Sequence, residues 1–399
     1  MAAGRRGKPT GWTAWALRRW RWGLAAWFLA LAVLTAWKGL AYYHAHSGWT
    51  IGDWLVNDHF GWVRRGLLGD GLLALSALTG VNLGLLVWAA QSLTYGLMFA
   101  FACRLLCALK QPGRFLPLLF APFLFTFQLH DGGYRKEILF LALLAAVAWV
   151  SIRPSRRLRE AFFAAAFWAF PLLVLSHEML LLFWPYLLGL YLVALPDHSL
   201  RRRVLTAVLP AAVSAALVLW LTLRPPLTAA QAEAMQTYLA QRGFAVQGGT
   251  IPWMTYPWRQ SFGYVLDLVL YHGYVLKYFG LWLLSLAAFW PLRTVWRQPE
   301  GTMLARTLAL GALASLAVLP LMVDWGRLLY VHLMAAFFYT AVLAWRHPPP
   351  PLPARSRRGW ALAVAGWGAY ALLWHIPVCY CGGHTAFGLA WLLHLLQAT

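Results

Sequence analysis

Long apolar runs alternate with short polar and basic clusters along the whole chain. The first run, Gly23 to Tyr43, contains a single charged residue, Lys38, and provides the roughly 20 residues that a membrane-spanning helix needs. Repetition of this pattern predicts an all-α, polytopic transmembrane helix bundle of about 11 to 12 spans in a single domain, residues 1–399. The later spans are expected at 81–101, 115–129, 138–152, 161–176, 179–195, 204–223, 272–292, 307–323, 328–345 and 360–376, and residues 384–399 either span once more or lie in the outer leaflet.

Composition supports a membrane protein and argues against a soluble one. Hydrophobic residues make up 61% of the 399 residues and charged residues only 11%, with a mean hydropathy of +0.60. That is more apolar surface than one soluble core can bury. The 25 Trp and 16 Tyr residues agree, because these rings concentrate at the two headgroup levels of a bilayer. The net charge of +21 would suggest nucleic acid in a soluble protein, but the basic residues lie in short clusters between apolar runs. Membrane orientation explains them more simply, and no nucleic-acid partner is expected.

The distribution of charge predicts the orientation of the chain. With the amino terminus in the cytoplasm, 23 of the 33 Lys and Arg residues fall on the cytoplasmic side, and 9 of the 12 Asp and Glu residues fall on the other. This is the asymmetry that the positive-inside rule requires. Three segments outside the membrane are expected. They are a first extracytoplasmic loop at 44–78 with interfacial amphipathic helices, a large extracytoplasmic loop at 224–271, and a cytoplasmic, Pro-rich basic linker at 346–359.

Acidic residues gather at the outer ends of the expected spans, although such residues contribute little to membrane orientation. They are Asp53, Asp58, Asp70, Asp131, Glu137, Glu178 and Asp324. Their neighbours along the chain include His177 and the cations Arg64, Arg65, Arg135, Lys136 and Arg327. Ionisable groups at membrane depth are costly and indicate a functional site when they face a common cavity. We therefore expect these residues to meet in one extracytoplasmic pocket.

This combination of groups suits the transfer of a sugar from a lipid-linked phosphate. Arginine grips phosphate oxygens and stabilises the negative charge that develops as the phosphate leaves. A carboxylate whose pKa is tuned by partial burial can take the proton of an incoming hydroxyl. Asp58 is the first candidate for this base, followed by Asp53 and Glu178. The substrate-binding candidates are Arg64, Arg65, Asp131, Arg135, Lys136, Glu137, His177, Asp324 and Arg327, with Trp253, Tyr256 and Trp258 of the large loop as stacking platforms for the acceptor.

The layout resembles the GT-C superfamily of integral membrane glycosyltransferases. The resemblance covers the overall topology and the loop segment DWLVNDHFGWVRRGLLGDGLL at 53–73, which follows the first span. In that superfamily an outer loop after the first span bears a catalytic Asp, and Asp53 or Asp58 occupies the corresponding place. The resemblance implies a polyprenyl-phosphate-linked sugar as donor and a glycan or lipid-linked acceptor. It also implies an extracytoplasmic active site and a location in a bacterial inner membrane.

Two other functions fit parts of the pattern. Bacterial glycan polymerases and ligases, which act on polyprenyl-diphosphate-linked glycan, are similar in span number and in their arginine-bearing outer loops. A membrane transporter or flippase would also bury charge between helices, but its polar residues should lie near the middle of the membrane in broken, paired helices. The expected spans around 139–150 and 308–319 contain no ionisable residue in those stretches. A transferase therefore remains the preferred interpretation.

The candidate residues also have structural interpretations. Asp58 would cap an interfacial helix, and Arg64 and Arg65 would anchor the chain to anionic headgroups. Asp324 and Arg327 would form an ion pair one helical turn apart. A divalent metal bound by His and carboxylate side chains is a further option, but no ligand spacing such as HExxH is present and no cofactor is expected.

Overall fold

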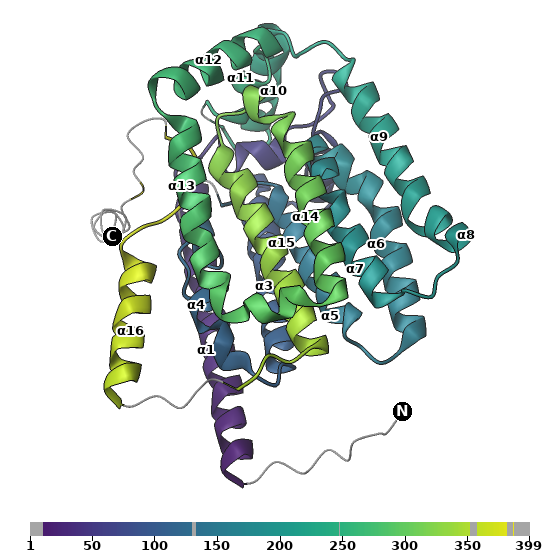
Figure 1. The fold of residues 1–399 in the computed structure, drawn as a ribbon. Helices are drawn as coiled ribbons and strands as arrows, with labels where there is room; N and C mark the ends of the chain where they lie inside the picture. The colour runs from purple at the N-terminus through teal and green to yellow at the C-terminus, as the bar shows by residue number, and fades with distance from the viewer. Residues whose placement is uncertain (1–10, 130–132, 247, 352–356, 381–385, 387–399) are drawn as a thin grey trace.

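A computed structural model describes residues 11–129, 133–246, 248–351, 357–380 and 386, which contain many helices and no β-strand (Figure 1). The predicted all-α fold is therefore confirmed for the described part of the chain. Short 3-10 or π-helical turns are labelled η. In chain order the elements are α1 (Gly11–His44), η1 (Gly52–Leu55), α2 (Leu67–Thr79), α3 (Leu83–Cys107), η2 (Pro112–Phe115), α4 (Leu116–Leu119), η3 (Phe127–Leu129), α5 (Glu137–Ser151), α6 (Arg156–Ser176), η4 (Glu178–Phe183), α7 (Trp184–Ala194), α8 (Leu200–Arg203), η5 (Val204–Val208), α9 (Leu209–Thr222), α10 (Ala229–Gln241), α11 (Thr250–Trp253), α12 (Trp258–Tyr271), α13 (Tyr274–Leu286), η6 (Ala287–Arg297), α14 (Pro299–Leu316), η7 (Leu319–Leu321), α15 (Trp325–Arg346) and α16 (Arg357–Leu372).

Seven of the described helical segments have the length and apolar composition to cross a membrane. They are Arg19–His44, Leu83–Cys107, Arg156–Ser176, Leu200–Thr222, Tyr274–Arg297, Pro299–Leu321 and Trp325–Arg346. Shorter apolar helices are Leu67–Thr79, Glu137–Ser151, Glu178–Ala194 and Ala361–Leu372. Together these helices indicate a membrane-embedded protein.

The expected span at 115–129 is not a continuous helix, and here the sequence prediction is wrong. The segment forms α4, a run of turns and η3, with most of its side chains buried. Pro117 lies in the first turn of α4, where proline is tolerated, but Pro122 lacks the N–H that a longer helix would need and its ring would clash with the preceding turn. Irregular backbone at membrane depth is tolerated where protein surrounds it. The expected tail at 384–399 lies, apart from residue 386, outside the described residues.

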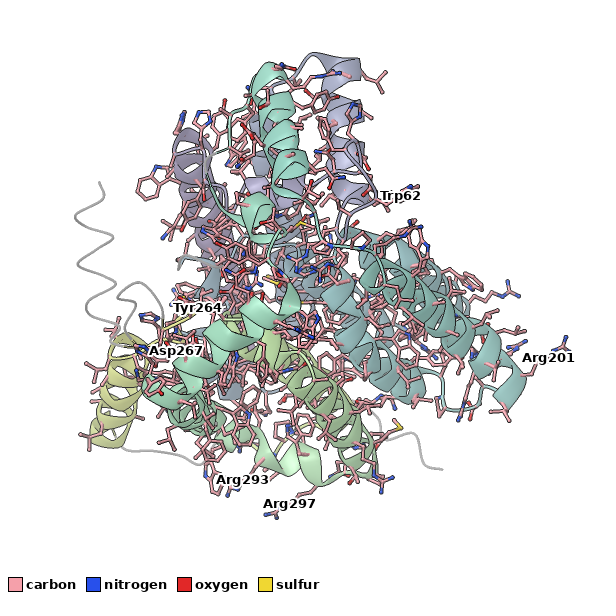
Figure 2. All side chains as sticks on the ribbon, turned by 90° about the horizontal axis from the view of Figure 1, so that it is seen from above. Trp62, Arg201, Tyr264, Asp267, Arg293 and Arg297 are labelled. Atoms are coloured by element: carbon pink, nitrogen blue, oxygen red, sulfur yellow. The ribbon has the colours of Figure 1, made fainter. Side chains whose placement is uncertain are left out.

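The outer helices expose apolar side chains. Examples from α1, α3, α9, α13 and α14 are Leu29, Leu93, Leu219, Leu276 and Leu313. Figure 2 shows the side chains that project from the bundle on all sides, with Arg201 among those at its edge. In water so large an apolar surface would favour aggregation, whereas in a bilayer it contacts lipid tails.

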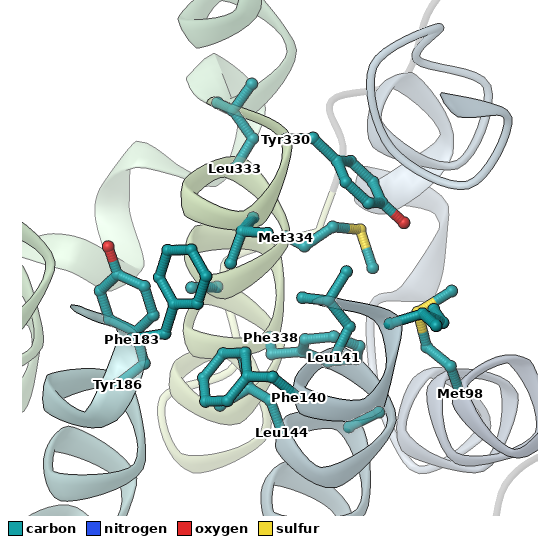
Figure 3. Packing of buried hydrophobic residues seen from close by; sticks show 14 of the residues in the cluster. Met98, Phe140, Leu141, Leu144, Phe183, Tyr186, Tyr330, Leu333, Met334 and Phe338 are labelled. Carbon is teal, nitrogen blue, oxygen red and sulfur yellow. The ribbon is translucent and has the colours of Figure 1, made fainter. Parts of the chain in front are cut away.

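The helices α5 and α15 form the centre of the bundle. α5 packs against α3, α6, α7 and α15. Figure 3 shows Phe140, Leu141 and Leu144 of α5 close to Met334 and Phe338 of α15, and all five are buried. With 15 residues, α5 is about 22 Å long, which is shorter than the ~30 Å hydrocarbon core of a bilayer. Polar groups can therefore gather at both ends of this central helix.

The two predicted outer loops cover the same end of the bundle. Figure 1 places α10, α11 and α12, which belong to the loop at 224–271, at the end opposite to the start of α1. The loop at 44–78 contains η1 and α2, and η1 packs against both α2 and α11. The backbone N–H of Thr250 donates to the carbonyl of Gly48 at 3.2 Å, which joins the two loops directly. The predicted linker at 346–359 begins where α15 ends and leads into α16, and its residues 352–356 are not among those described.

Candidate active site

Nine ionisable side chains from five segments meet at the end of the bundle that α10, α11 and α12 cover. The segments are η1, the loop after it, the turn before α5, the junction of α6 and η4, and the start of α15. We call this set the charge network, and its members are Asp53, Arg65, Arg135, Lys136, Glu137, His177, Glu178, Asp324 and Arg327. All nine belong to the site residues expected from the sequence.

Arg65 links two carboxylates from different parts of the chain. Its Nη2 and Nε atoms lie 3.0 and 3.1 Å from Oε1 and Oε2 of Glu178, and its Nη1 lies 3.4 Å from Oδ1 of Asp53. The backbone of Arg65 has a φ of 78°, in the left-handed region that costs a non-glycine residue about 1–2 kcal/mol. Lys136 Nζ donates to the carbonyl oxygen of Arg65 at 2.8 Å. The network therefore holds both the side chain and the strained backbone of this residue.

Arg135 joins both outer loops to α15. Its Nη1 donates to the carbonyl of Trp49 and to Oγ1 of Thr250, each at 2.6 Å, and lies 3.4 Å from Asp53 Oδ1. Its Nη2 lies 3.6 Å from Asp324 Oδ2. The guanidinium carbon is 5.0 Å from the centre of the Trp49 ring, within cation–π range. This buried cation thus has partners in and just before η1, in α11 and at the start of α15.

Arg327 and His177 complete the network beside α5. Arg327 Nη2 lies 3.2 Å from Asp324 Oδ2 and 3.5 Å from Glu137 Oε1. His177 lies 3.4 Å from Glu137 through Nε2 and 3.5 Å from Glu178 through Nδ1. Glu137 and Asp324 stand at the N-terminal ends of α5 and α15, where the helix dipole favours negative charge. Arg327 keeps two buried nitrogens, Nε and Nη1, without a hydrogen-bond partner among the described residues, so two of its N–H groups remain to donate to an oxygen anion.

The network is balanced in charge. Apart from His177, its four Arg and Lys side chains face four carboxylates. Burial alone would raise the pKa of Asp53, but Arg135, Lys136 and Arg65 lower it to about 2. Burial lowers the pKa of Lys136 to about 8, and Asp53 opposes that shift. A carboxylate held so firmly in its ionised form anchors cations well and accepts protons poorly.

Asp58 lies beside this network, in the loop after η1. Its Oδ1 accepts from the backbone N–H of Val63 at 2.8 Å, and its own N–H donates to the carboxylate of Asp70 at 3.2 and 3.3 Å. A Cβ at Gly66 would lie 2.2 Å from Asp58 Oδ1, so this packing needs glycine. Burial raises the pKa of Asp58, the hydrogen bond from Val63 opposes the shift, and the charge of Asp70 adds to it. Asp58 thus combines partial burial with a raised pKa, as a general base requires.

Arg64 is exposed and lines a shallow hollow on the surface together with Trp62 and Arg224. Neither arginine has an ion-pair partner in the part of the chain that the structure describes. Arg224 lies over Trp220 at 4.6 Å, and the Trp62 and Trp220 rings meet edge to face at 5.4 Å. Figure 2 shows Trp62 at the periphery of the molecule. The hollow, at the end of α9, therefore presents two arginines that have no ion-pair partner among the described residues.

The predicted stacking residues lie in and after α11. The Trp253 ring is 4.9 Å from that of Tyr256 and 6.1 Å from that of Trp49. Trp49 also contacts Arg135. Trp49, Trp253 and Tyr256 therefore form a chain of ring contacts from the charge network to the exposed Tyr256. Trp258, at the start of α12, is exposed as well.

Asp131, also expected in the site, lies outside the described residues. Within the described ranges, no group of three or more His, Cys, Asp or Glu side chains could hold a metal ion. Two contacts of Arg135 were missed from the sequence, those with Trp49 and Thr250. These contacts involve a backbone carbonyl, an aromatic ring and a hydroxyl group. None of these groups is charged, so the distribution of charged residues along the sequence does not indicate the contacts. Comparison of the chain with protein-family models, curated proteins and solved structures finds no match.

Proposed function

We propose that this protein is a membrane glycosyltransferase. It would transfer a sugar from a polyprenyl-phosphate-linked donor to a glycan or lipid-linked acceptor at the extracytoplasmic face of a bacterial inner membrane. One observation supports this most. Arg65 belongs to a buried, charge-balanced network, and the loop that carries it also presents Asp58, a carboxylate with a raised pKa, and Arg64, a cation with no ion-pair partner among the described residues.

The proposed reaction is a single displacement. The acceptor hydroxyl attacks the anomeric carbon of the donor sugar while Asp58 takes the hydroxyl proton. As the new bond forms, the bond between the anomeric carbon and the phosphate oxygen breaks, and its electron pair leaves with the polyprenyl phosphate. Arg64 and the unpaired nitrogens of Arg327 would stabilise the negative charge on that phosphate. Asp58 then returns its proton to water.

The network residues have a positioning role in this proposal. Asp53, with a pKa of about 2, remains ionised and holds Arg65 and Arg135. Glu178 holds Arg65 from the other side. The half-buried Trp253 and the exposed Tyr256 would stack against the acceptor, since a sugar ring offers apolar C–H faces to such rings.

The proposal retains about 11 to 12 membrane crossings, with the charge network on the extracytoplasmic side. The shorter apolar helices α5, α7 and α16 and the irregular segment at 115–129 would add four crossings to those of the seven longer helices, and residues 384–399 would make a twelfth if they span. Basic residues at the far ends of α5 and α15, such as Arg153 and Arg346, support this orientation through the positive-inside rule.

Loss of the protein from its host cell tests the proposal. Cells without it should accumulate a truncated acceptor together with unused polyprenyl-phosphate-linked sugar. A polymerase or ligase would instead leave complete single repeat units, and a flippase would leave its lipid-linked product on the cytoplasmic leaflet. Reintroduced Asp58→Asn should fail to restore the full glycan. Asp267→Asn, which changes an exposed carboxylate on α12, should restore it.

A further inference from the structure

A cavity of about 640 Å³ lies at the opposite end of α5 and α15 from the charge network. It forms where α3, α5 and α15 end and where α6 and α14 begin. The ionisable side chains that line it are Lys110, Arg153, Arg159, Glu300, Arg346 and His347. Four permanent cations thus face one carboxylate, in contrast to the balanced network at the other end.

Two of the arginines are held in place by hydrogen bonds, but one N–H donor of each has no partner among the described residues. Arg346 Nη2 donates to the carbonyl of Val193 at 2.7 Å, and its Nη1 lies 3.7 Å from Glu300 Oε1. Arg159 donates through Nη1 to the carbonyls of residues 153 and 154. The Nε atoms of Arg159 and Arg346 are both buried and have no hydrogen-bond partner among the described residues. Each guanidinium therefore retains a donor that the described residues do not satisfy.

The other two cations lack carboxylate partners among the described residues. Lys110 and Arg153 are exposed, and Arg153 lies over the Trp149 ring at 4.8 Å. Glu300 is shared by Arg346 and His347, whose Nε2 lies 3.2 Å from Glu300 Oε2. The single carboxylate of the cavity is thus already engaged.

Helix dipoles do not account for the whole surplus. The carbonyl ends of α3, α5 and α15 contribute about 1.5 negative charges, and the amino ends of α6 and α14 contribute about one positive charge, which leaves about half a negative charge from the helix ends. Four cations less Glu300 leave three positive charges, so a surplus of about 2.5 positive charges remains after the helix ends are counted. A bound phosphate group carries about 1.5 to 2 negative charges and would offset most of that surplus.

We propose that this cavity is a binding site for a phosphate-bearing anion, separate from the transfer site. Its volume lies in the range of small-molecule sites and exceeds what one inorganic ion fills. Two sources share this chemistry. One is the headgroup of an anionic lipid, since basic pockets between transmembrane helices bind such headgroups. The other is a soluble phosphate compound that enters from the aqueous side.

Binding to the purified, full-length protein tests the site without any turnover. Native mass spectrometry would measure retention of cardiolipin, with phosphatidylcholine as the zwitterionic control. Thermal unfolding in detergent would measure stabilisation by pyrophosphate, with sulfate-free buffer as reference. The test variant is Lys110→Gln with Arg153→Gln, because neither side chain has an ion-pair partner among the described residues and the fold should survive.

The matched control variant is Arg293→Gln with Arg297→Gln. Both residues are exposed basic side chains at the ends of the bundle, labelled in Figure 2, and Arg293 lies over Trp290 at 4.3 Å as Arg153 lies over Trp149. The test variant lacks two cations, each worth about 1 kcal/mol near an anionic group, so it should bind about 30-fold more weakly. The control variant should bind as the wild type does.

Each outcome decides the matter. Selective loss of cardiolipin supports a lipid headgroup site, and selective loss of the pyrophosphate effect supports a soluble ligand. Failure of the wild type to bind either probe overturns the proposal, as does equal loss in the test and control variants. None of these results depends on glycosyl transfer, so this inference and the proposed function can fail separately.

Discussion

Arg65 and Glu178, 113 residues apart in the chain, meet through two hydrogen-bonded contacts of 3.0 and 3.1 Å. This pair ties the loop after η1 to the junction of α6 and η4, and Asp53 lies against the same guanidinium. The Arg65 side chain is therefore one of the contacts that fix the loop carrying Asp58 and Arg64 to the bundle. Disturbing that side chain should affect both stability and the proposed site.

Removing either partner of this pair should destabilise the protein. Arg65→Gln or Glu178→Gln alone should lower the free energy of unfolding by about 3 kcal/mol, because each leaves a buried charge unpaired. The double variant should lose less than the sum, by about 1–3 kcal/mol. Titration with SDS in mixed micelles, followed by far-ultraviolet circular dichroism, measures this. Arg201→Gln on α8 should change stability by less than about 0.5 kcal/mol. Additive losses from the two single variants would show that the pair is not coupled.

Thr250 should stabilise the fold through its hydroxyl. Thr250→Val keeps the shape of the side chain but removes the acceptor that lies 2.6 Å from Arg135 Nη1. The expected loss is about 1–3 kcal/mol in the same titration, because a buried donor is left short of a partner. Thr250→Ser keeps the hydroxyl and should lose much less. Similar stability of the Val and Ser variants would contradict this role.

Asp58 should set the acid side of the pH–rate profile. A base acts only when deprotonated, so the transfer rate should rise with pH through the raised pKa of Asp58. Asp70→Asn keeps an oxygen for the Asp58 N–H but removes the charge that helps to raise this pKa. The pKa should then fall, and the acid limb should move to lower pH. An unmoved limb in the Asp70 variant, with activity retained, would exclude Asp58 as the titrating group.

Lys136 should set the alkaline limb of the pH–rate profile. Its pKa is lowered to about 8, so above that pH it loses its charge and the network gains a net negative charge. The donor phosphate should then bind more weakly, and KM should rise while kcat changes less. Lys136→Arg keeps the positive charge at all pH values tested and should remove this limb. Persistence of the same limb in the arginine variant would assign it to another group.

The helices could be predicted from the sequence because few backbone conformations are stable in lipid. The bilayer core has no water to bond the backbone N–H and C=O groups, so a run of about 20 apolar residues must form these hydrogen bonds within itself. For a single segment, only a helix does so. Expected spans at 81–101 and 328–345 accordingly match α3 and α15 closely. The segment at 115–129 is as apolar as these, but Pro122 stops the helix and burial by surrounding helices makes turns tolerable.

The site was predictable only in part. Charged residues at span ends stand out in an apolar chain, so Arg65, Arg135 and Glu178 could be listed as candidates. Their pairing could not, because it depends on how helices distant in sequence pack together. The division between a buried network and the more accessible Asp58 also needed the structure, since Asp53 and Asp58, two of the three carboxylates of the loop, look alike in sequence.

The central claim is tested most directly by transfer of label from a defined donor. Proteoliposomes containing the full-length protein would receive polyprenyl phosphates carrying tritiated glucose, galactose, mannose or N-acetylglucosamine, together with acceptor extracted from host cells that lack the protein. Label should pass to the acceptor from one donor with the wild type and with Asp267→Asn. With Asp58→Asn the rate should fall by about 10²- to 10⁴-fold, the usual share of a general base, while the protein stays folded. Wild-type protein that consumes none of these donors, or an Asp58→Asn variant as fast as the wild type, would contradict the account.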